Sequence, residues 1–371
     1  MFNIVKFFLN IVFTISPLLI GSSSNWLSVT AKLVLYGYSL FLIVFALVNI
    51  KSFKVKLNFI FFIIILFSLY LILRSDTMHG LAMALQFILL LIICVLYNGR
   101  SLPFISFNPW MLFSIALFSS FLELLSPGLV FANKNYWSVM LLLYMIPVLF
   151  VVRSEILLAL LVSFSMFLLV VSGSRAVLIS MLISYILVFH FIAVKFDYKK
   201  VMKLFILMVF VWFSLGLAQS IYQNIDYYNA IFLDLTGKRL ESGRIDIWMV
   251  LLNHLTFLDV IFGKGGGVDV GNVINEKLSA HSNYVYLIFT YGVIGLIMFL
   301  SVCFLLLSHL KKEKMYISMF FSLALLFRDF FEVSLVHNNY PIAFFFWIIF
   351  LTSSLELKLR KYNETSITRY G

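Results

Sequence analysis

The sequence predicts an all-α polytopic integral membrane protein of about twelve transmembrane helices. Hydrophobic residues make up 63% of the chain and charged residues only 12%, whereas roughly half of a soluble domain is apolar. Long apolar runs follow one another from Lys6 to about Glu356, separated by short polar breaks. We therefore expect residues 1–371 to form a single membrane domain.

The apolar runs give the spans in order. The first run resembles a signal peptide, but further spans follow it, so we expect an uncleaved helix. The run at 315–331 is the least regular, because it ends in charged residues, and a re-entrant segment there would change the C-terminal topology. The predicted spans are 4–20, 27–50, 57–73, 79–97, 108–126, 137–152, 155–172, 176–194, 201–220, 283–308, 315–331 and 341–356.

Basic residues between the spans predict the orientation. If the spans cross the bilayer alternately, many lysines and arginines fall on one face, which the positive-inside rule makes cytoplasmic. An even number of spans places both termini there, in a bacterial plasma membrane. The basic residues on this face are Lys51, Lys54, Lys56, Arg100, Lys195, Lys199, Lys200, Lys203, Lys311, Lys312, Lys314, Lys358, Arg360 and Lys361.

Composition also excludes two kinds of site. The formal charge of +11 resides mostly in cytoplasmic loops, where topology and anionic lipid account for it, so we expect no nucleic-acid partner. Cys94 and Cys303 lie inside apolar runs, and we expect neither a disulfide nor a metal site.

The longest external loop is expected at about residues 221–281, between the ninth and tenth spans. Within it, Ser242 is a suitable N-cap for a helix over 243–254. Such a helix would lie at the membrane surface and present Arg244 and free amide groups to a lipid-linked phosphate. Its apolar stripe, at spacings of three and four, is Ile245, Trp248, Leu252 and Leu255.

Four cations are expected at the outer level of the membrane: Lys134, Arg175, Arg244 and Arg328. A single arginine at a helix end ordinarily reaches into the lipid headgroups. Several together suit a pyrophosphate, which guanidinium groups bind well. Arg328 has an alternative, because nearby acids, Asp329 and Glu332, can pair with it.

Two histidines are candidates for proton transfer at neutral pH, His281 before the tenth span and His337 in the last external loop. The residues themselves do not decide between them. Asn283 is positioned to hold His281 or to bind a sugar hydroxyl.

Other external features have structural interpretations. Asn133, Lys134 and Asn135 form either an ordinary polar turn or part of a binding site. Gly263–Gly267 is not a Walker motif and is expected to be a flexible bend. Gly292 and Gly295 are expected to permit close helix packing. Glu123 either pairs with Arg175 or Lys134 or accepts a proton.

In their order along the chain, these motifs resemble the O-antigen ligase and polymerase superfamily of bacterial envelope glycosyltransferases, over roughly residues 130–300. The fold that the resemblance implies is the helical membrane bundle with one larger external loop. One departure is that Ser282 separates His281 from Asn283, whereas the family histidine is commonly followed directly by Asn. The matching segments are Phe131-Ala132-Asn133-Lys134-Asn135, Ser172-Gly173-Ser174-Arg175, Ser242-Gly243-Arg244-Ile245-Asp246-Ile247-Trp248, Phe262-Gly263-Lys264-Gly265, His281-Ser282-Asn283 and Tyr291-Gly292-Val293-Ile294-Gly295.

The resemblance implies an enzyme at the outer face of the plasma membrane that uses glycans carried on undecaprenyl pyrophosphate. It implies neither a metal nor another cofactor. Arg175 and Arg244 would bind the donor pyrophosphate, and His281 would activate an acceptor hydroxyl. Asn133, Lys134, Asn135, Asn283, Arg328 and His337 are further candidates for substrate binding.

Polymerisation of lipid-linked repeat units into O-antigen or capsular polysaccharide is the favoured function. The alternative is a ligase that transfers finished glycan to lipid A–core or to protein, and a more remote alternative is a secondary transporter. The transporter is disfavoured because charged residues lie near span ends rather than at mid-membrane. Expected partners are the lipid-linked oligosaccharide and membrane lipid, with association of a chain-length regulator or a flippase left open.

Overall fold

The computed structural model describes most of the predicted membrane domain. Within the described residues the regular secondary structure is helical, apart from one isolated bridge between Ser75 and Gly266. The described residues are 15–16, 24–49, 59–98, 100, 102–103, 108–131, 134–152, 155–172, 174–193, 227, 230, 234, 244–268, 270–274, 280–336, 340–351 and 356–357.

The helices follow the predicted spans closely. The predicted spans 4–20, except for Ile15 and Ser16, and 201–220 lie outside the described residues. The helices in the positions of the other spans are α2 (Asn25–Val48), α3 (Phe59–Leu73), α4 (Met78–Tyr97), α5 (Pro109–Leu125), α6 (Lys134–Leu149), α7 (Glu155–Ser172), α8 (Arg175–Ala193), α14 (Asn283–Lys312), α15 (Tyr316–Arg328) and α16 (Tyr340–Phe344), which continues into the π-helix η1 (Phe345–Phe350).

The expected polytopic membrane protein is consistent with these helices. Three of them, Trp26–Val48, Met78–Tyr97 and Asn283–Lys312, are long and apolar enough to cross a membrane, and several shorter helices are also apolar. Large apolar side chains on their surfaces are exposed, including Leu73 and Met78. Exposed apolar side chains on such helices suit contact with lipid.

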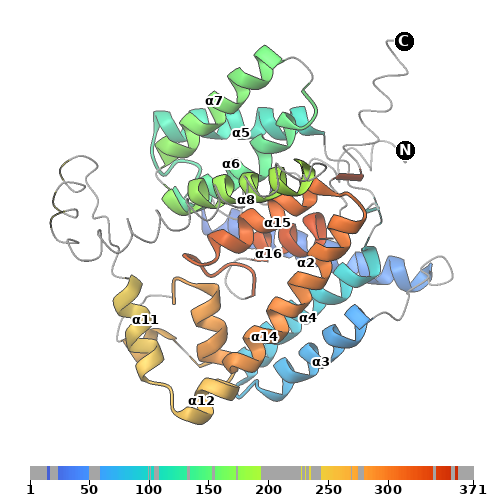
Figure 1. Ribbon diagram of the computed structural model, residues 1–371, viewed down its shortest axis with the longest axis vertical. Coiled ribbons are helices and arrows are strands. Elements are labelled where there is room, and N and C mark those ends of the chain that lie inside the picture. Colours follow the sequence, from blue (N-terminus) through green and yellow to red (C-terminus); the bar gives the residue numbers. More distant parts are fainter. Residues whose placement is uncertain are drawn as a thin grey trace.

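Figure 1 shows two groups of helices, with α15 and α16 between them. Helices α5 to α8 lie together, with α5 against α6, α6 against α7, and α15 against α8. In the other group, α14 packs beside α3, which in turn packs against α4. The short helices α11 (Arg244–Asn253), α12 (Phe257–Phe262) and α13 (Val270–Ile274) lie in the predicted external loop, and α12 packs on α14.

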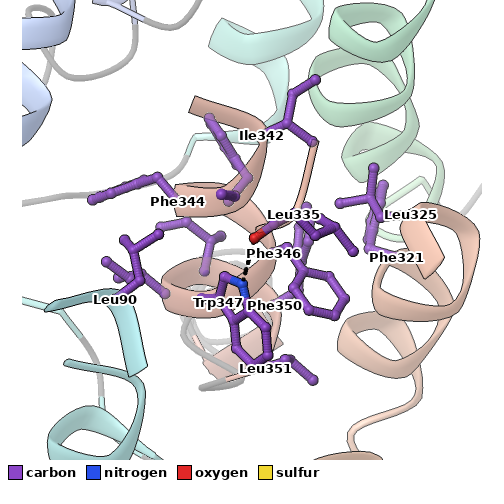
Figure 2. Packing of buried hydrophobic residues seen from close by; sticks show 14 of the residues in the cluster. Leu90, Phe321, Leu325, Leu335, Ile342, Phe344, Phe346, Trp347, Phe350 and Leu351 are labelled. Carbon is purple, nitrogen blue, oxygen red and sulfur yellow. Dashed lines mark hydrogen bonds between the residues drawn. The ribbon is translucent and has the colours of Figure 1, made fainter. Parts of the chain in front are cut away.

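Side chains of η1 and α15 lie at the centre of the apolar core. Trp347 is fully buried in η1, and its indole Nε1 donates a hydrogen bond of 3.1 Å to the carbonyl of Leu335 (Figure 2). Phe350 stacks on Phe321 of α15 with ring centroids 4.7 Å apart. These contacts fix the turn that follows α15, which carries the candidate site described below.

A break at Gly292 divides α14. This glycine has φ 66° and ψ −176°, so the helix stops there and restarts. Carbonyl groups left free by the break accept hydrogen bonds from the glycine-rich segment: Lys264 N to Phe289 O at 2.8 Å and Gly265 N to Thr290 O at 2.9 Å. The expected flexible bend at Gly263–Gly267 is therefore wrong, since its backbone is bonded to α14.

Residues at the end of α3 also donate hydrogen bonds to the glycine-rich segment and to α14. Arg74 donates through Nε to the carbonyl of Phe262 at 3.0 Å and through Nη2 to that of Gly263 at 2.6 Å. The Tyr70 hydroxyl donates to the carbonyl of Tyr291 at 2.7 Å. We call this assembly of the 263–267 segment, the end of α3 and the break in α14 the glycine junction.

Glycine is required at the break for two reasons. The positive φ of Gly292 is a conformation that side chains disfavour. A Cβ atom at Gly292 would also overlap the carbonyl of Ile261. The predicted close packing at this glycine is thus confirmed, because the backbone of Ile261 lies directly against it. The contact occurs at a break in α14, however, and not between two continuous helices.

Candidate functional site

Three segments far apart in the sequence meet at the carboxylate of Glu332. The Asn135 side chain donates through Nδ2 to Glu332 Oε1 at 3.0 Å, and Arg244 Nη2 lies 3.1 Å from the same oxygen. The charges of both Glu332 and Arg244 act on the His281 imidazole. We call Asn135, Arg244, His281 and Glu332 the Glu332 cluster.

Local structure places each member of the cluster. Asn135 lies in the first turn of α6, and Arg244 begins α11. Trp248, one turn further along α11, donates through Nε1 to the carbonyl of Ala280 at 2.8 Å. This bond fixes the chain next to His281, which has the left-handed φ of 48°.

Ser282 has a structural role that explains its place between His281 and Asn283. Its side chain accepts a hydrogen bond from Val285 N at 3.4 Å and so acts as the N-cap of α14. The backbone N–H of Asn283 donates to the carbonyls of Asp329 and Glu332, at 2.8 and 3.0 Å. The start of α14 is thereby attached to the turn that carries Glu332.

The Asn283 side chain faces inward. It is fully buried, and neither of its amide atoms has a hydrogen-bond partner among the described residues. In this conformation the side chain is not accessible at the surface of the protein. Its backbone, rather than its amide group, connects it to the Glu332 cluster.

The environment of His281 favours the neutral imidazole. Burial lowers the pKa of His281 from its usual 6.5, the negative charge of Glu332 opposes this shift, and Arg244 adds to it. A histidine with a lowered pKa is unprotonated at pH 7 and can accept a proton. The cluster thus combines a neutral base with a guanidinium group.

Arg328 belongs to a separate, buried network. It donates through Nη1 to Ser334 Oγ at 2.8 Å and forms an ion pair with Asp329 Oδ1 at 3.4 Å. Asp329 also accepts from Leu335 N at 3.1 Å. The expected pairing of Arg328 with Asp329 is confirmed, whereas the other acid, Glu332, pairs with Arg244.

Glu123 stabilises the loop that leads to Asn135. Its two carboxylate oxygens accept hydrogen bonds from the backbone N–H groups of Gly128, Val130 and Phe131, at 2.7, 3.1 and 3.1 Å. The described interactions of this acid are thus with the backbone. The side chains of both cations considered as its partners, Arg175 and Lys134, are outside the described part of the chain.

The backbone still places the start of α8 near the cluster. Ser172, at the end of α7, donates to Ser138 of α6 at 2.9 Å. Arg175 begins α8 three residues after Ser172, and Asn135 lies three residues before Ser138. Arg175 and Asn135 are therefore at the same end of the bundle. Asn133, His337 and Ser242 are outside the described residues.

Sequence reasoning missed the role of Glu332. The sequence indicated this acid only as a partner of Arg328. The available signal was an acidic residue in the last predicted external turn, on the same side of the membrane as the cationic motifs.

One protein family matches the region that contains several of these residues. Residues 156–300 match the family described as O-Antigen ligase (Wzy_C). This range extends from α7 into α14 and includes Arg175, Arg244 and His281. A search of curated proteins gives no match. The family implies a membrane enzyme that transfers glycans from lipid-linked substrates.

Proposed function

We propose that this chain, which carries an O-antigen ligase domain over residues 156–300, polymerises undecaprenyl-pyrophosphate-linked repeat units at the outer face of the plasma membrane. The observation that carries the proposal is the meeting of Arg244 and His281 beside Glu332. These two groups come from separate segments, and together they supply the base and the anion-binding group that glycosyl transfer requires.

The proposed reaction is a displacement at the anomeric carbon of the donor sugar. A hydroxyl oxygen of the acceptor sugar attacks this carbon while His281 takes the hydroxyl proton. The bond from the anomeric carbon to the pyrophosphate oxygen breaks, and undecaprenyl pyrophosphate leaves with the electron pair. Arg244 and Arg175 offset the negative charge that develops on the leaving group.

His281 is preferred to His337 as the base. Its pKa is lowered by burial, and it lies within electrostatic range of Arg244. The acceptor hydroxyl and the leaving pyrophosphate must lie close together in the reaction, so the base and the cation should be neighbours.

A ligase remains the alternative, because ligase and polymerase use the same donor chemistry. The two reactions differ in the acceptor, which is a second lipid-linked repeat for the polymerase and lipid A–core or a protein for the ligase. We favour the polymerase because the sequence is rich in Phe, Ile, Leu and Asn.

The test is the surface-glycan profile of a deletion strain restored with wild-type protein or with single variants. A polymerase predicts loss of the polymer ladder on deletion, with one repeat unit kept on the acceptor. A ligase predicts a bare acceptor and long polymer retained on the lipid carrier. An unchanged ladder would reject both enzymes and favour transport.

The variants Arg175→Ala, Arg244→Ala and His281→Ala should each fail to restore the ladder at normal membrane protein levels. His254→Ala is the matched control, since His254 is exposed in the same external segment. Full activity of His281→Ala would remove this histidine as the base and leave His337 as the candidate.

A further inference from the structure

We propose that Glu332 is a positioning residue of the transferase site, which holds Arg244 and Asn135 beside His281. The inference rests on the proposed function, because it assigns a role within the same reaction. It concerns a residue outside the matched family range of 156–300.

The geometry shows one acceptor atom shared by two elements. Asn135 of α6 and Arg244 of α11 both bond to Oε1 of Glu332, at 3.0 and 3.1 Å. The backbone carbonyl of Glu332 also accepts from Asn283 N at the start of α14, at 3.0 Å. Glu332 therefore bonds to residues of α6, α11 and α14, three helices that are far apart in the sequence.

The turn that carries Glu332 is itself firmly held. On one side of it, Asp329 accepts hydrogen bonds from Ser334 Oγ at 2.5 Å and from Leu335 N at 3.1 Å. The carbonyl of Leu335 accepts from Trp347 in the core. Glu332 is thus a fixed point, and the external helix α11 is attached to it through Arg244.

The ion pair leaves Arg244 able to bind a ligand. A guanidinium group has five N–H donors, and the bond from Arg244 to Glu332 uses Nη2. The pair is partly exposed, with 22% of the Arg244 side chain and 18% of the Glu332 side chain accessible. Arg244 can therefore keep its contact with Glu332 while its other donors face a pyrophosphate.

Glu332 has a second effect, through its charge on His281. The charges of Glu332 and Arg244 act on this imidazole in opposite directions: Glu332 raises the pKa of His281 and Arg244 lowers it. Removal of the Glu332 charge leaves burial and Arg244 acting together, and both favour the neutral imidazole.

The experiment compares Glu332→Ala and Glu332→Gln in the full-length protein, in membrane vesicles supplied with lipid-linked repeat units. Loss of positioning in Glu332→Ala should lower kcat/KM on the order of a hundredfold. Gln keeps an oxygen acceptor for Arg244 and Asn135, so most activity should return. Its pH–rate profile should extend to lower pH than that of wild type, because His281 has lost a negative neighbour. Glu313→Gln, an exposed acid at the other end of α14, is the control.

Two results would overturn the inference. One is wild-type kcat/KM in Glu332→Ala. The other is an equal loss in both variants with an unshifted pH profile, which would indicate general structural damage.

A readout that needs no activity separates this inference from the proposed function. Spin labels on cysteines introduced at Asn253 in α11 and Glu313 after α14 report how firmly α11 is held. Positioning predicts a broader distance distribution in Glu332→Ala than in Glu332→Gln, and equal distributions would reject it. If the distances change as expected but wild-type vesicles form no glycan product, the proposed function fails and the positioning of Arg244 stands.

Discussion

At the scale of single residues, His281 has the most specific setting in the site. Because its folded-state pKa is lowered from 6.5, the imidazole stays neutral over a wider range toward acid. We predict that kcat/KM falls on the acid side with an apparent pKa below 6.5, which a pH–rate profile of wild-type enzyme would measure. An acid limb above 6.5 would contradict this assignment of the base.

The same shift has a stability consequence of defined sign. An unfolded chain binds a proton at His281 at a higher pH than the folded chain does. The contribution of this residue to stability is therefore full above pH 6.5 and is lost as pH falls through the lower folded-state pKa. His281→Ala should reduce the acid sensitivity of thermal unfolding, measured against wild type between neutral and mildly acidic pH.

The two arginines of the region should differ in what they do for stability. Arg328→Met leaves Asp329 buried without its cation, which costs about 3–5 kcal/mol when a buried pair is broken. Arg244→Met breaks a partly exposed pair with Glu332, and such pairs contribute roughly 0–1 kcal/mol.

Thermal unfolding in detergent should thus show a large loss for Arg328→Met and a small one for Arg244→Met. A loss of similar size in both would show that Arg244 is structural, and would weaken its assignment to the donor site.

At the residue scale, sequence motifs indicated Arg244 and His281 as candidates for the site, and their roles stay predictions. The structure places the two side chains within electrostatic range of each other. The pairing of Glu332 with Asn135 and Arg244 could not be recognised, because these partners lie 197 and 88 residues away. Contacts at such separations have no periodic pattern in a sequence.

At the scale of elements, the broken helix α14 is the main feature that apolar patterning could not show. Its residues read as one continuous span, and the span does occupy the expected place. The break depends on the positive φ of Gly292 and on bonds from Lys264 and Gly265. A hydropathy pattern identifies the apolar run, but it does not predict the backbone hydrogen bonds from residues outside that run.

The glycine junction predicts a sharp contrast between two Gly→Ala substitutions. Gly292→Ala should destabilise the protein by more than about 1 kcal/mol, because the new Cβ both disfavours the positive φ and meets the Ile261 carbonyl. Gly37→Ala in α2 is the matched control, since a Cβ there meets nothing within 4 Å.

Gly37→Ala should leave stability unchanged or raise it by up to about 1 kcal/mol, the usual difference between Gly and Ala in a helix. Unfolding temperatures of the two variants in the same detergent measure this. Equal temperatures would mean that α14 can close its break without cost.

At the scale of the whole molecule, the orientation in the membrane is testable with two cysteine variants. The native Cys94 and Cys303 are buried, so they contribute little labelling. An impermeant maleimide should label Asn253→Cys in intact cells, because α11 lies in the predicted external loop. Glu313→Cys follows α14 beside Lys311, Lys312 and Lys314, and should react only after the membrane is opened.

The reverse labelling pattern would turn the cluster toward the cytoplasm and would rule out the proposed external reaction. The described contacts already agree on sidedness, since segments predicted to be external bond to one another. Examples are Arg74 with Gly263 and Asn135 with Glu332.

The glycine junction also sets an order on biosynthesis. Arg74 is synthesised 188 residues before Phe262, whose carbonyl it binds. During translation, α3 therefore enters the bilayer with a guanidinium at its end that has not yet met this partner. The junction closes only after the ribosome has made Gly292 and the break in α14. A nascent chain that stops before Phe262 lacks both carbonyl partners of Arg74, so this part of the bundle assembles only after α12 and the break in α14 have been synthesised.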